Sequence, residues 1–480
     1  MKIRMPIFIY QMLCIAFTTG CSVSEKAELH STPGLMSSAA EGTLMPERLA
    51  GIRTAAETGD PSAMHALGHA LYHGDGGLQD SKQAAFWISK AAEHGIREAM
   101  TELGLMYFEG QGLDQDDAAA YRWFLRAAEV GDTRAFSYLG LLTMEGRGVP
   151  KNLSESIHWY EKAAAAGDLV AMHNLATFYL KDAGEDLDPE RAIVYLRRAA
   201  EGGSVHDMCI LGNVLIMGHD EDYARQEEAT RWFQRAAEAG HGRSMYFLGQ
   251  RLRYGKGAPQ DSSQAYFWLQ RAVEEGVSES ELAIGQLLLS SLMGPPNYKE
   301  AYQWFIKASE HGWPEAMWHI GRLYQQGLGI QKDLQKSFEW FQLSATTHNP
   351  YGTPFARGMY QVGMAYLNGE GTAAAPKQAA YWLSQAVEHE YPRAYLPLSI
   401  LYAQGNGAPK SLQKAIQLLR EGAEAGDPAT AYALGLCYQH GEGVSKDLEQ
   451  AHYWLNKAKA SGYRGHLTQL ELLDPEERSP

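Results

Sequence analysis

The stretch "ATAYALGLCYQHGEGVSKDLEQAHYWLNKAKASG" (residues 429–462) contains the signals that recur along this chain. Its first part places apolar and small residues three and four positions apart, which is the period of an amphipathic helix. The glycines Gly441 and Gly443 follow, then Asp447, and then a second helical segment with Trp454. Glycine often ends a helix and aspartate often caps the start of one. The stretch therefore predicts two helices joined by a short turn.

This pattern repeats eleven times between about residues 60 and 462, with a period of 36 residues. A Leu-Gly pair or a close variant marks most first helices, a tryptophan marks most second helices, and Asp, Asn or Ser precedes the second helix. Glycine inside a helix costs about 1 kcal/mol relative to alanine. We therefore expect close helix approach at each Leu-Gly pair, with the tryptophan as the large residue opposite the missing side chain.

One such helix pair cannot bury both of its apolar faces, whereas stacked pairs bury a continuous core. The repeats therefore predict an all-α, right-handed α-solenoid of about eleven 36-residue helix-turn-helix units over residues 60–462. Seven methionines occupy one column of the first helices and are interpreted as adaptable core filler. They are Met64, Met100, Met172, Met208, Met245, Met317 and Met359.

The recurring glycine pair could also suggest a phosphate-binding loop. A dinucleotide-binding fingerprint follows a strand, however, and a Walker loop ends in Gly-Lys-Ser/Thr. Here the pair follows a predicted helix and precedes a capping residue in eight copies. We interpret it as turn chemistry and expect no cofactor. The fourth, fifth and seventh copies lose the pair, at "LKDAGEDLD" (180–188), "MGHDEDYARQEE" (217–228) and "SLMGPPNYKE" (291–300), so their turns should differ.

The repeat resembles that of the Sel1-like repeat family, a relative of tetratricopeptide repeats. The family pattern is Ala-x-x-x-Leu-Gly, a tyrosine, Gly-x-Gly-Val, Asp, Lys-Ala, Trp and Lys-Ala-Ala, and residues 429–462 match it almost throughout. The resemblance covers about 400 residues of the chain. It implies a scaffold or adaptor, and several members of the family are bacterial envelope proteins.

The N-terminus predicts export. Lys2 and Arg4 precede the apolar run "PIFIYQMLCIAF" (6–17), which is typical of a signal peptide over residues 1–20. The ending "TTGC" (18–21) resembles the lipobox of bacterial lipoproteins, so we expect lipidation at Cys21, with cleavage by the ordinary signal peptidase as the alternative. The predicted location is the periplasmic side of a bacterial membrane, with the outer membrane favoured, or otherwise the periplasm or the medium.

The remaining segments flank the predicted solenoid. Residues 21–45 are rich in Ser, Ala, Gly and Glu and predict a flexible tether. Residues 46–59 predict an N-terminal capping helix, and 463–480 a C-terminal capping helix with a frayed tail. No segment after the signal is apolar enough to span a bilayer.

Composition narrows the classes of partner. Hydrophobic residues make up 45% of the chain, which is ample for a folded protein. The formal net charge is −15, and no basic run is long enough to override that field. We therefore expect no nucleic-acid partner.

Possible catalytic and metal-binding residues have simpler explanations. "SLQK" (411–414) matches the Ser-x-x-Lys of penicillin-interacting enzymes, but its companion motifs are missing and Ser411 lies in the capping column. His65, His69 and His73 lie four apart and could bridge a divalent metal, although a solvated groove is the favoured interpretation. The acidic loop 182–190 lacks the spacing of a calcium loop. The sequence thus predicts no catalytic residue and no metal site.

The remaining candidate for function is the surface of the first helices. Copies six to nine place aromatic residues beside arginines, the composition of interface hot spots, although tyrosine is also common at this position of the family. The candidate partner-binding residues are Tyr246, Arg253, Trp318, Arg322 and Tyr360. The insertion "TTHNPYGTPFARG" (346–358) follows next to them and should form a shaped loop.

The predicted function is non-enzymatic. We expect a protein or peptide partner on the concave solenoid surface, within an assembly of the bacterial cell envelope. The alternatives are a glycan-binding scaffold for exopolysaccharide assembly, because tryptophan and tyrosine also bind sugars, and an enzyme acting on peptidoglycan or a β-lactam. Cys209 and Cys437, far apart in the stack, should be free thiols.

Overall fold

The computed structural model describes residues 46–75, 79–182, 187–217 and 222–463. The predicted signal peptide, the tether with Cys21 and all but the first residue of the predicted C-terminal cap lie outside the described residues. The chain divides into two units, residues 1–241 (unit 1) and 242–480 (unit 2).

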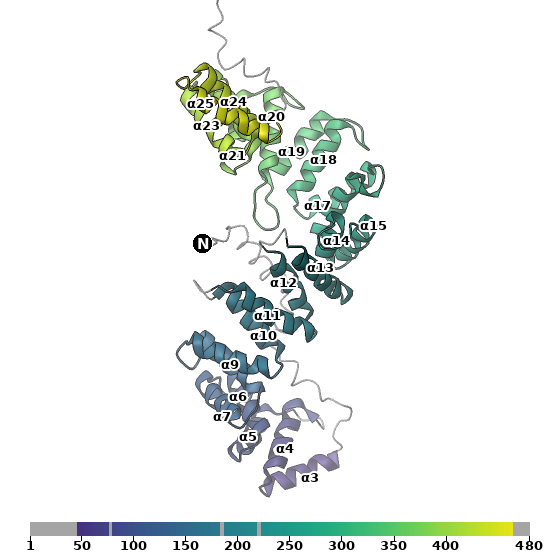
Figure 1. Cartoon of the computed structure of the whole chain (residues 1–480). Coiled ribbons are helices and arrows are strands. Elements are labelled where there is room, and N and C mark those ends of the chain that lie inside the picture. Colours follow the sequence, from purple (N-terminus) through teal and green to yellow (C-terminus); the bar gives the residue numbers. More distant parts are fainter. Residues whose placement is uncertain (1–45, 76–78, 183–186, 218–221, 464–480) are drawn as a thin grey trace, which may run out of the picture. The chain divides into compact units, whose positions relative to one another are not determined.

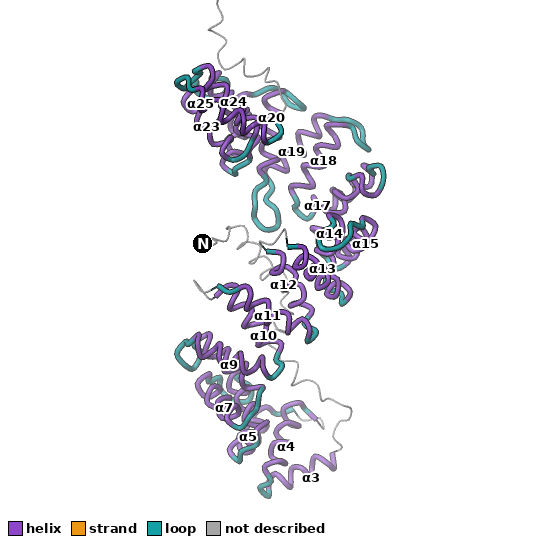
Figure 2. The backbone as a smooth tube through the Cα atoms, viewed as in Figure 1, coloured by secondary structure: helices purple, strands orange, loops and turns teal. Residues whose placement is uncertain are grey.

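Helices and their connections make up both units, and the described residues contain no β-strand (Figures 1 and 2). The helices of unit 1 are α3 (Pro46–Glu57), α4 (Pro61–His73), α5 (Ser81–Glu93), α6 (Arg97–Glu109), α7 (Asp117–Glu129), α8 (Arg134–Glu145), α9 (Leu153–Ala165), α10 (Leu169–Thr177), the π-helical turn η2 (Phe178–Asp182), α11 (Pro189–Glu201), α12 (Val205–Ile216) and α13 (Tyr223–Glu238).

Unit 2 continues the same alternation. Its helices are α14 (Gly242–Tyr254), α15 (Ser262–Glu274), α16 (Glu279–Leu289), the 3₁₀ turn η4 (Ser291–Met293), α17 (Tyr298–Glu310), α18 (Pro314–Gln326), α19 (Leu334–Thr346), α20 (Ala356–Asn368), α21 (Pro376–Glu388), the 3₁₀ turn η5 (Pro392–Ala394), α22 (Tyr395–Gln404), α23 (Leu412–Glu424), α24 (Pro428–His440) and α25 (Leu448–Ala460).

Each repeat is a pair of helices that pack on each other, as α4 packs on α5 and α18 on α19. The second helix of one pair then packs on the first helix of the next, as α5 does on α6. One buried cluster in unit 1 includes Leu49 of α3, Ile88 of α5 and Leu142 of α8. The core therefore runs between successive repeats, as in other stacked repeat proteins, and the predicted all-α solenoid is confirmed.

The methionine column lies inside this core. All seven side chains are buried, with Met245 fully inaccessible. Cys209 and Cys437 are buried and neither forms a disulfide, as expected, and burial raises the pKa of the Cys437 thiol to about 12.

The turns confirm the predicted capping chemistry. A first helix ends at a glycine in the left-handed region, as at Gly110 and Gly327, and the amide of that glycine donates to the carbonyl four residues back. Side chains of the capping column accept from the free amides of the second helix. They are Asp80, Asp116, Asn152, Asp188, Asp261, Asn297, Asp333, Ser411 and Asp447.

In most of the described pairs the second glycine has its own structural reason, which the sequence did not reveal. Gly112 and Gly371 both have positive φ. A Cβ on Gly112 would collide with the backbone carbonyl of Ser81, and one on Gly371 with that of Leu334. Ser81 and Leu334 begin the second helix of the preceding repeat. The second glycine therefore lets the turn of one repeat pack closely against the N-terminus of the second helix of the preceding repeat.

The predicted partner of the Leu-Gly pair is wrong by one residue. A Cβ on Gly104 would lie 2.7 Å from the ring of Phe124, which follows Trp123. The same holds at every other Leu-Gly position and its variants. The residues opposite are Ile88, Tyr160, Phe233, Leu269, Phe305, Phe341, Leu383 and Leu455. Consecutive residues of a helix point about 100° apart, so the tryptophans lie beside this contact and not in it.

Most of the tryptophans instead lie under a basic side chain three residues later on the same helix. The Nζ of Lys307 lies 4.1 Å from the ring centroid of Trp304, and Cζ of Arg126 lies 4.4 Å from that of Trp123. Such cation–π contacts between i and i+3 residues cover the ring while it stays half-buried. The Lys-Ala-Ala and Arg-Ala-Ala motifs thus supply the cover for the tryptophan.

The three copies without a glycine pair have different turns, as expected. The first helix of the fourth copy runs from α10 into the π-helical turn η2. In the fifth copy α12 ends at Met217 in an extended conformation, and in the seventh copy the 3₁₀ turn η4 follows α16. Among the described residues, every helix is too short or too polar to traverse a bilayer.

Candidate binding surface

Unit 2 contains a pocket of about 380 Å³ beside Trp318. Trp318 and His319 come from α18, and Gln286 from α16. Phe355 and Arg357 come from the end of the insertion and the first turn of α20. The pocket is therefore formed by the seventh to ninth repeats, beside the insertion, and its volume is within the range of small-ligand pockets.

Trp318 forms part of the pocket wall and lies between two arginines. Its side chain is buried, with 8% of the residue exposed. The Cζ atoms of Arg322 and Arg357 lie 5.1 and 4.9 Å from its ring centroid. Arg322 is one turn further along α18 and therefore shares its face with Trp318. The indole Nε1 of Trp318 is buried and has no hydrogen-bond partner in the protein.

Arg253 is the third arginine of this region and is 7% exposed. Its Nη1 donates to Oε1 of Gln286 at 3.2 Å, while its Nε is buried and unpartnered. Burial lowers the pKa of the Arg253 guanidinium, because removal from water disfavours the charged form. The cation remains charged at neutral pH, since the pKa of arginine is ordinarily above 12. Gln286 links it to the pocket.

The pKa of His319 is lowered in part by the positive charges of the three arginines. Its ring stacks on Phe305 with centroids 4.6 Å apart. Burial, followed by the charges of Arg322, Arg357 and Arg253, lowers the pKa of His319 to about 3. The imidazole is therefore neutral across the physiological range and adds no charge of its own.

Glu315 is the acidic residue of the pocket wall. One carboxylate oxygen, Oε2, is buried without a hydrogen-bond partner. Burial raises the pKa of Glu315, while a backbone hydrogen bond and the charge of Arg357 act in the opposite direction. The pocket region thus contains three arginines and one incompletely satisfied carboxyl group.

The two predicted tyrosines contribute less directly. The ring of Tyr360 lies 5.2 Å from that of Tyr391, which is part of the pocket wall. Tyr246 accepts a hydrogen bond from Nε2 of Gln250 at 3.2 Å, one turn along α14. The structure therefore brings Trp318 and Arg322 together at the pocket. Arg253 and Tyr360 each contact a residue of the pocket wall, Gln286 and Tyr391 respectively. Tyr246 does not line the pocket.

Sequence reasoning missed several residues of the pocket, including Arg357, Phe355 and Glu315. The insertion over residues 346–358 was the available signal, because it contains Phe355 and Arg357. Their positions depend on the path of an irregular loop, which repeat periodicity does not describe.

The insertion is also held by contacts of Tyr351 with residues that are distant in the sequence. Figure 2 shows it as the long loop between α19 and α20. The hydroxyl of Tyr351 donates a short hydrogen bond to the carboxylate of Glu279, and the guanidinium of Arg243 donates to the same hydroxyl at 3.5 Å. The Tyr351 ring lies 5.8 Å from that of Trp313. One side chain of the insertion thus contacts the beginnings of α14, α16 and α18.

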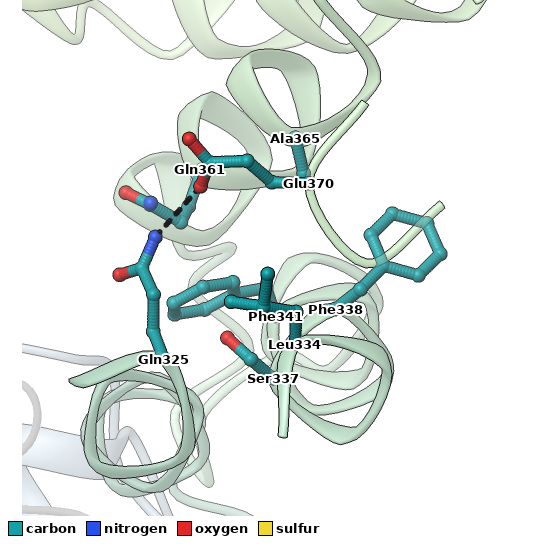
Figure 3. A pocket seen from close by; sticks show the side chains of 8 residues that line it. All are labelled: Gln325, Leu334, Ser337, Phe338, Phe341, Gln361, Ala365 and Glu370. Carbon is teal, nitrogen blue, oxygen red and sulfur yellow. Dashed lines mark hydrogen bonds between the residues drawn. The ribbon is translucent and has the colours of Figure 1, made fainter. Parts of the chain in front are cut away.

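A second cavity in unit 2 is too small for a ligand. It lies between α18, α19 and α20 and has a volume of about 10 Å³, enough for one water molecule (Figure 3). Nε2 of Gln325 donates to Oε2 of Glu370 at 3.0 Å across it, and Phe341 forms part of its wall.

Unit 1 differs at the positions that correspond to Trp318. At three of these positions, each directly after the methionine column, a polar side chain is bonded to a carboxylate at the start of the next first helix. The pairs are Thr101–Asp132 at 2.8 Å, Ser137–Asp168 at 2.5 Å and His173–Asp207 at 2.7 Å. These groups satisfy one another, whereas the donors around Trp318 do not.

The other candidates from the sequence have structural roles. Oγ of Ser411 accepts from the backbone N–H of Lys414 at 3.2 Å, as a helix cap does. Nε2 of His65 lies 3.0 Å from Glu102, and the rings of His69 and His73 are tilted against each other with centroids 4.3 Å apart. In the described part of the chain, no three His, Cys, Asp or Glu side chains converge as metal ligands would. Part of the acidic loop 182–190 lies outside the described residues.

Comparison with known families identifies the repeat. The model of the Sel1 repeat matches eleven segments. They are residues 61–96, 97–132, 137–168, 169–204, 208–241, 242–277, 278–313, 314–346, 356–391, 392–427 and 428–463.

A solved structure with the same kind of repeat is similar to this chain. The chain is similar to a protective antigen with an SLR fold from uropathogenic Escherichia coli, at 26% identity and a TM-score of 0.65, over 88% of this chain and 92% of that one. It is also similar to a Sel1 repeat protein from Oxalobacter formigenes, at 24% identity and a TM-score of 0.36, over 74% and 93%. No curated protein matches the chain.

Proposed function

The chain belongs to the Sel1 repeat family, and we propose that it is a non-enzymatic scaffold that binds a protein or peptide partner at the pocket of unit 2. Sel1 repeat proteins are generally protein-interaction scaffolds. One observation supports this choice of surface. Trp318 lines a pocket, its ring contacts two arginines, and its buried indole N–H has no hydrogen-bond partner.

The contrast with unit 1 supports this choice. A buried polar group without a partner costs about 1–3 kcal/mol, and most proteins satisfy such groups internally. Thr101, Ser137 and His173 of unit 1 do so with carboxylates from their own chain. A partner that supplied acceptors to Trp318 would remove the same cost in unit 2, and aromatic–arginine clusters are typical of residues that dominate binding energy.

We further propose that the protein acts in the cell envelope, held at the periplasmic side of a membrane by lipid on Cys21. The basic and apolar leader followed by "TTGC" supports this proposal. Labelling cells with an alkyne fatty acid should mark the wild-type protein and not Cys21→Ala. Label on both proteins, or on neither, would contradict lipidation at this residue.

In-envelope cross-linking followed by mass spectrometry tests the binding surface. Trp318→Ala should lose partners that the wild-type protein captures. Trp304→Ala is the matched control, because Trp304 is half-buried on α17 in the same unit and is covered by Lys307. Equal capture by wild type and Trp318→Ala, or equal loss in both variants, would argue against recognition at Trp318.

A further inference from the structure

We propose that the pocket beside Trp318 binds carboxylate groups of an acidic segment in the partner protein. This inference depends on the proposed function and specifies the chemistry that the partner presents. It is carried by three arginines that lack carboxylate partners, by two buried unpaired donors, and by the apolar wall that surrounds them.

Three arginines lie around the pocket residue His319. Within the described residues, Arg253, Arg322 and Arg357 form no ion pair. Other arginines of the protein do find carboxylates. Examples are Arg134–Asp132 at 2.6 Å, Arg147–Asp117 at 2.8 Å and Arg197–Glu228 at 2.9 Å. The formal net charge is −15, so carboxylates are abundant, and Glu315 lies in the same pocket wall, yet it forms no ion pair with these three cations.

Burial makes the missing carboxylate costly. A guanidinium removed from water loses hydration that only a counter-charge and hydrogen bonds restore. Arg253 is 7% exposed and obtains a single neutral acceptor, Oε1 of Gln286. Its Nε remains buried and unpartnered. A carboxylate that approached past Gln286 would supply both the charge and the acceptor.

The indole of Trp318 is the second unpaired donor. Its Nε1 is buried without a partner, and the residue is 8% exposed. An indole N–H can only donate, so whatever satisfies it must present an acceptor. A carboxylate has about four acceptor positions and can be shared between an indole and a guanidinium. Arg322 and Arg357 lie against the same ring and would complete such a site.

Two other titratable groups of the pocket, His319 and Glu315, do not attract an anion. His319 is uncharged for the reasons given above. Glu315 opposes an incoming anion when ionised, but burial raises its pKa and so disfavours that state. Three permanent cations against one carboxyl group leave the balance positive.

The size and lining of the pocket favour a peptide over a free inorganic anion. Phe355, Tyr391 and the ring of Trp318 give the 380 Å³ pocket an aromatic wall. A carboxylate carried on the methylenes of glutamate can use both the wall and the cations, whereas phosphate can use only the cations. A long polyanion is disfavoured by the overall charge of the chain.

Fluorescence anisotropy with defined peptides tests the inference on the full chain. The probe is fluorescein-Gly-Glu-Glu-Glu-Leu-amide, and the matched probe replaces each Glu by Gln. The Glu peptide should bind about tenfold tighter or more, and added salt should weaken it, since charge pairing contributes to the affinity. A free C-terminal carboxylate on the Glu peptide should leave the affinity the same or raise it.

The variants are Arg322→Gln and Arg357→Gln, which are exposed residues and should leave folding intact. Together they should weaken the Glu peptide by about tenfold or more and leave the Gln peptide within about twofold. Arg271→Gln is the control, because Arg271 also lies over a tryptophan of unit 2, at 5.8 Å from the Trp268 centroid. It should leave both affinities unchanged.

Equal binding of the two peptides, or no effect of the double variant, would overturn the carboxylate site. So would inorganic phosphate competing as well as the Glu peptide, which would indicate a phosphate site. These failures can be told apart from failure of the proposed function. If both peptides bind equally and Trp318→Ala abolishes their binding, the proposed binding surface at Trp318 is supported and only the proposed preference for carboxylates is wrong.

Discussion

Gly321 of α18 lies directly against the ring of Phe341 on α19, so that a Cβ at Gly321 would be 2.7 Å from Cδ1 of Phe341. The same relationship between a mid-helix glycine and a large apolar side chain joins the two helices in most repeats. It explains why glycine recurs along this chain at a position where alanine would form a better isolated helix.

Gly321→Ala should therefore destabilise unit 2, although alanine is the better helix former. Overpacking in a core costs about 1–3 kcal/mol, which outweighs a propensity gain of about 1 kcal/mol. The measurement is the urea midpoint followed by circular dichroism. Gly51→Ala is the control, because no heavy atom lies within 4 Å of a Cβ there and Gly51 is inside α3. A stabilised Gly321→Ala protein would contradict the close-packing account.

His173 should make unit 1 more stable in mild acid. Desolvation opposes its charged form, but the charge of Asp207 and its hydrogen bond to Nδ1 outweigh this and raise the His173 pKa above 6.5. A raised pKa adds stability below the unfolded value that is lost as pH rises through the folded value. Urea midpoints of unit 1 should thus fall from about pH 6 to about pH 8.

His173→Gln should reduce this fall, and His158→Gln should not, because His158 is exposed on α9. The ring of His206 lies 5.6 Å from that of His173, so His206→Gln is measured as well. If the pH dependence persists unchanged in His173→Gln, the pair with Asp207 is not its source.

Tyr351→Phe should loosen the insertion. The change removes the hydroxyl that donates to the carboxylate of Glu279, which keeps its ion pair with Arg243, and a hydrogen bond to a charged group contributes about 1.5–3 kcal/mol. Hydrogen exchange of residues 347–355 should accelerate while that of α24 stays the same. Tyr381→Phe is the control, since Tyr381 is 55% exposed. Unchanged exchange in Tyr351→Phe would show that the hydroxyl does not anchor the loop.

Ser411 separates the capping role from the catalytic alternative. Ser411→Ala should cost about 0.5–2 kcal/mol of stability, whereas Ser411→Asp should restore it, because aspartate caps a helix equally well. Thermal unfolding measures both. Turnover of a β-lactam by the wild-type protein that is lost in Ser411→Asp would instead support an enzyme.

The features predicted correctly from the sequence are those that each repeat determines locally. A capping residue such as Asp333 needs only the free amides of its own helix, so its column could be recognised without a structure. The partner of Gly321 could not, because Trp340 and Phe341 are adjacent and periodicity alone does not say which one faces the glycine.

The candidate site shows the same limit. Trp318 and Arg322 are one turn apart on one helix, and their proximity follows from helical geometry. Arg357 reaches the same ring only because the insertion brings the start of α20 to it. The contact of Tyr351 with Glu279 spans 72 residues and depends on the folded loop. Contacts of this kind have no signal in a repeat pattern.

The most direct test of recognition at the pocket is site-specific photo-cross-linking in the native envelope. A photoreactive residue at position 356, in the pocket wall, should form adducts with a partner, and the Glu peptide amide should suppress them while its Gln counterpart does not. The same residue at position 271, over Trp268, should give no such adducts. Adducts that are equal at both positions, or that neither peptide suppresses, would contradict recognition at Trp318.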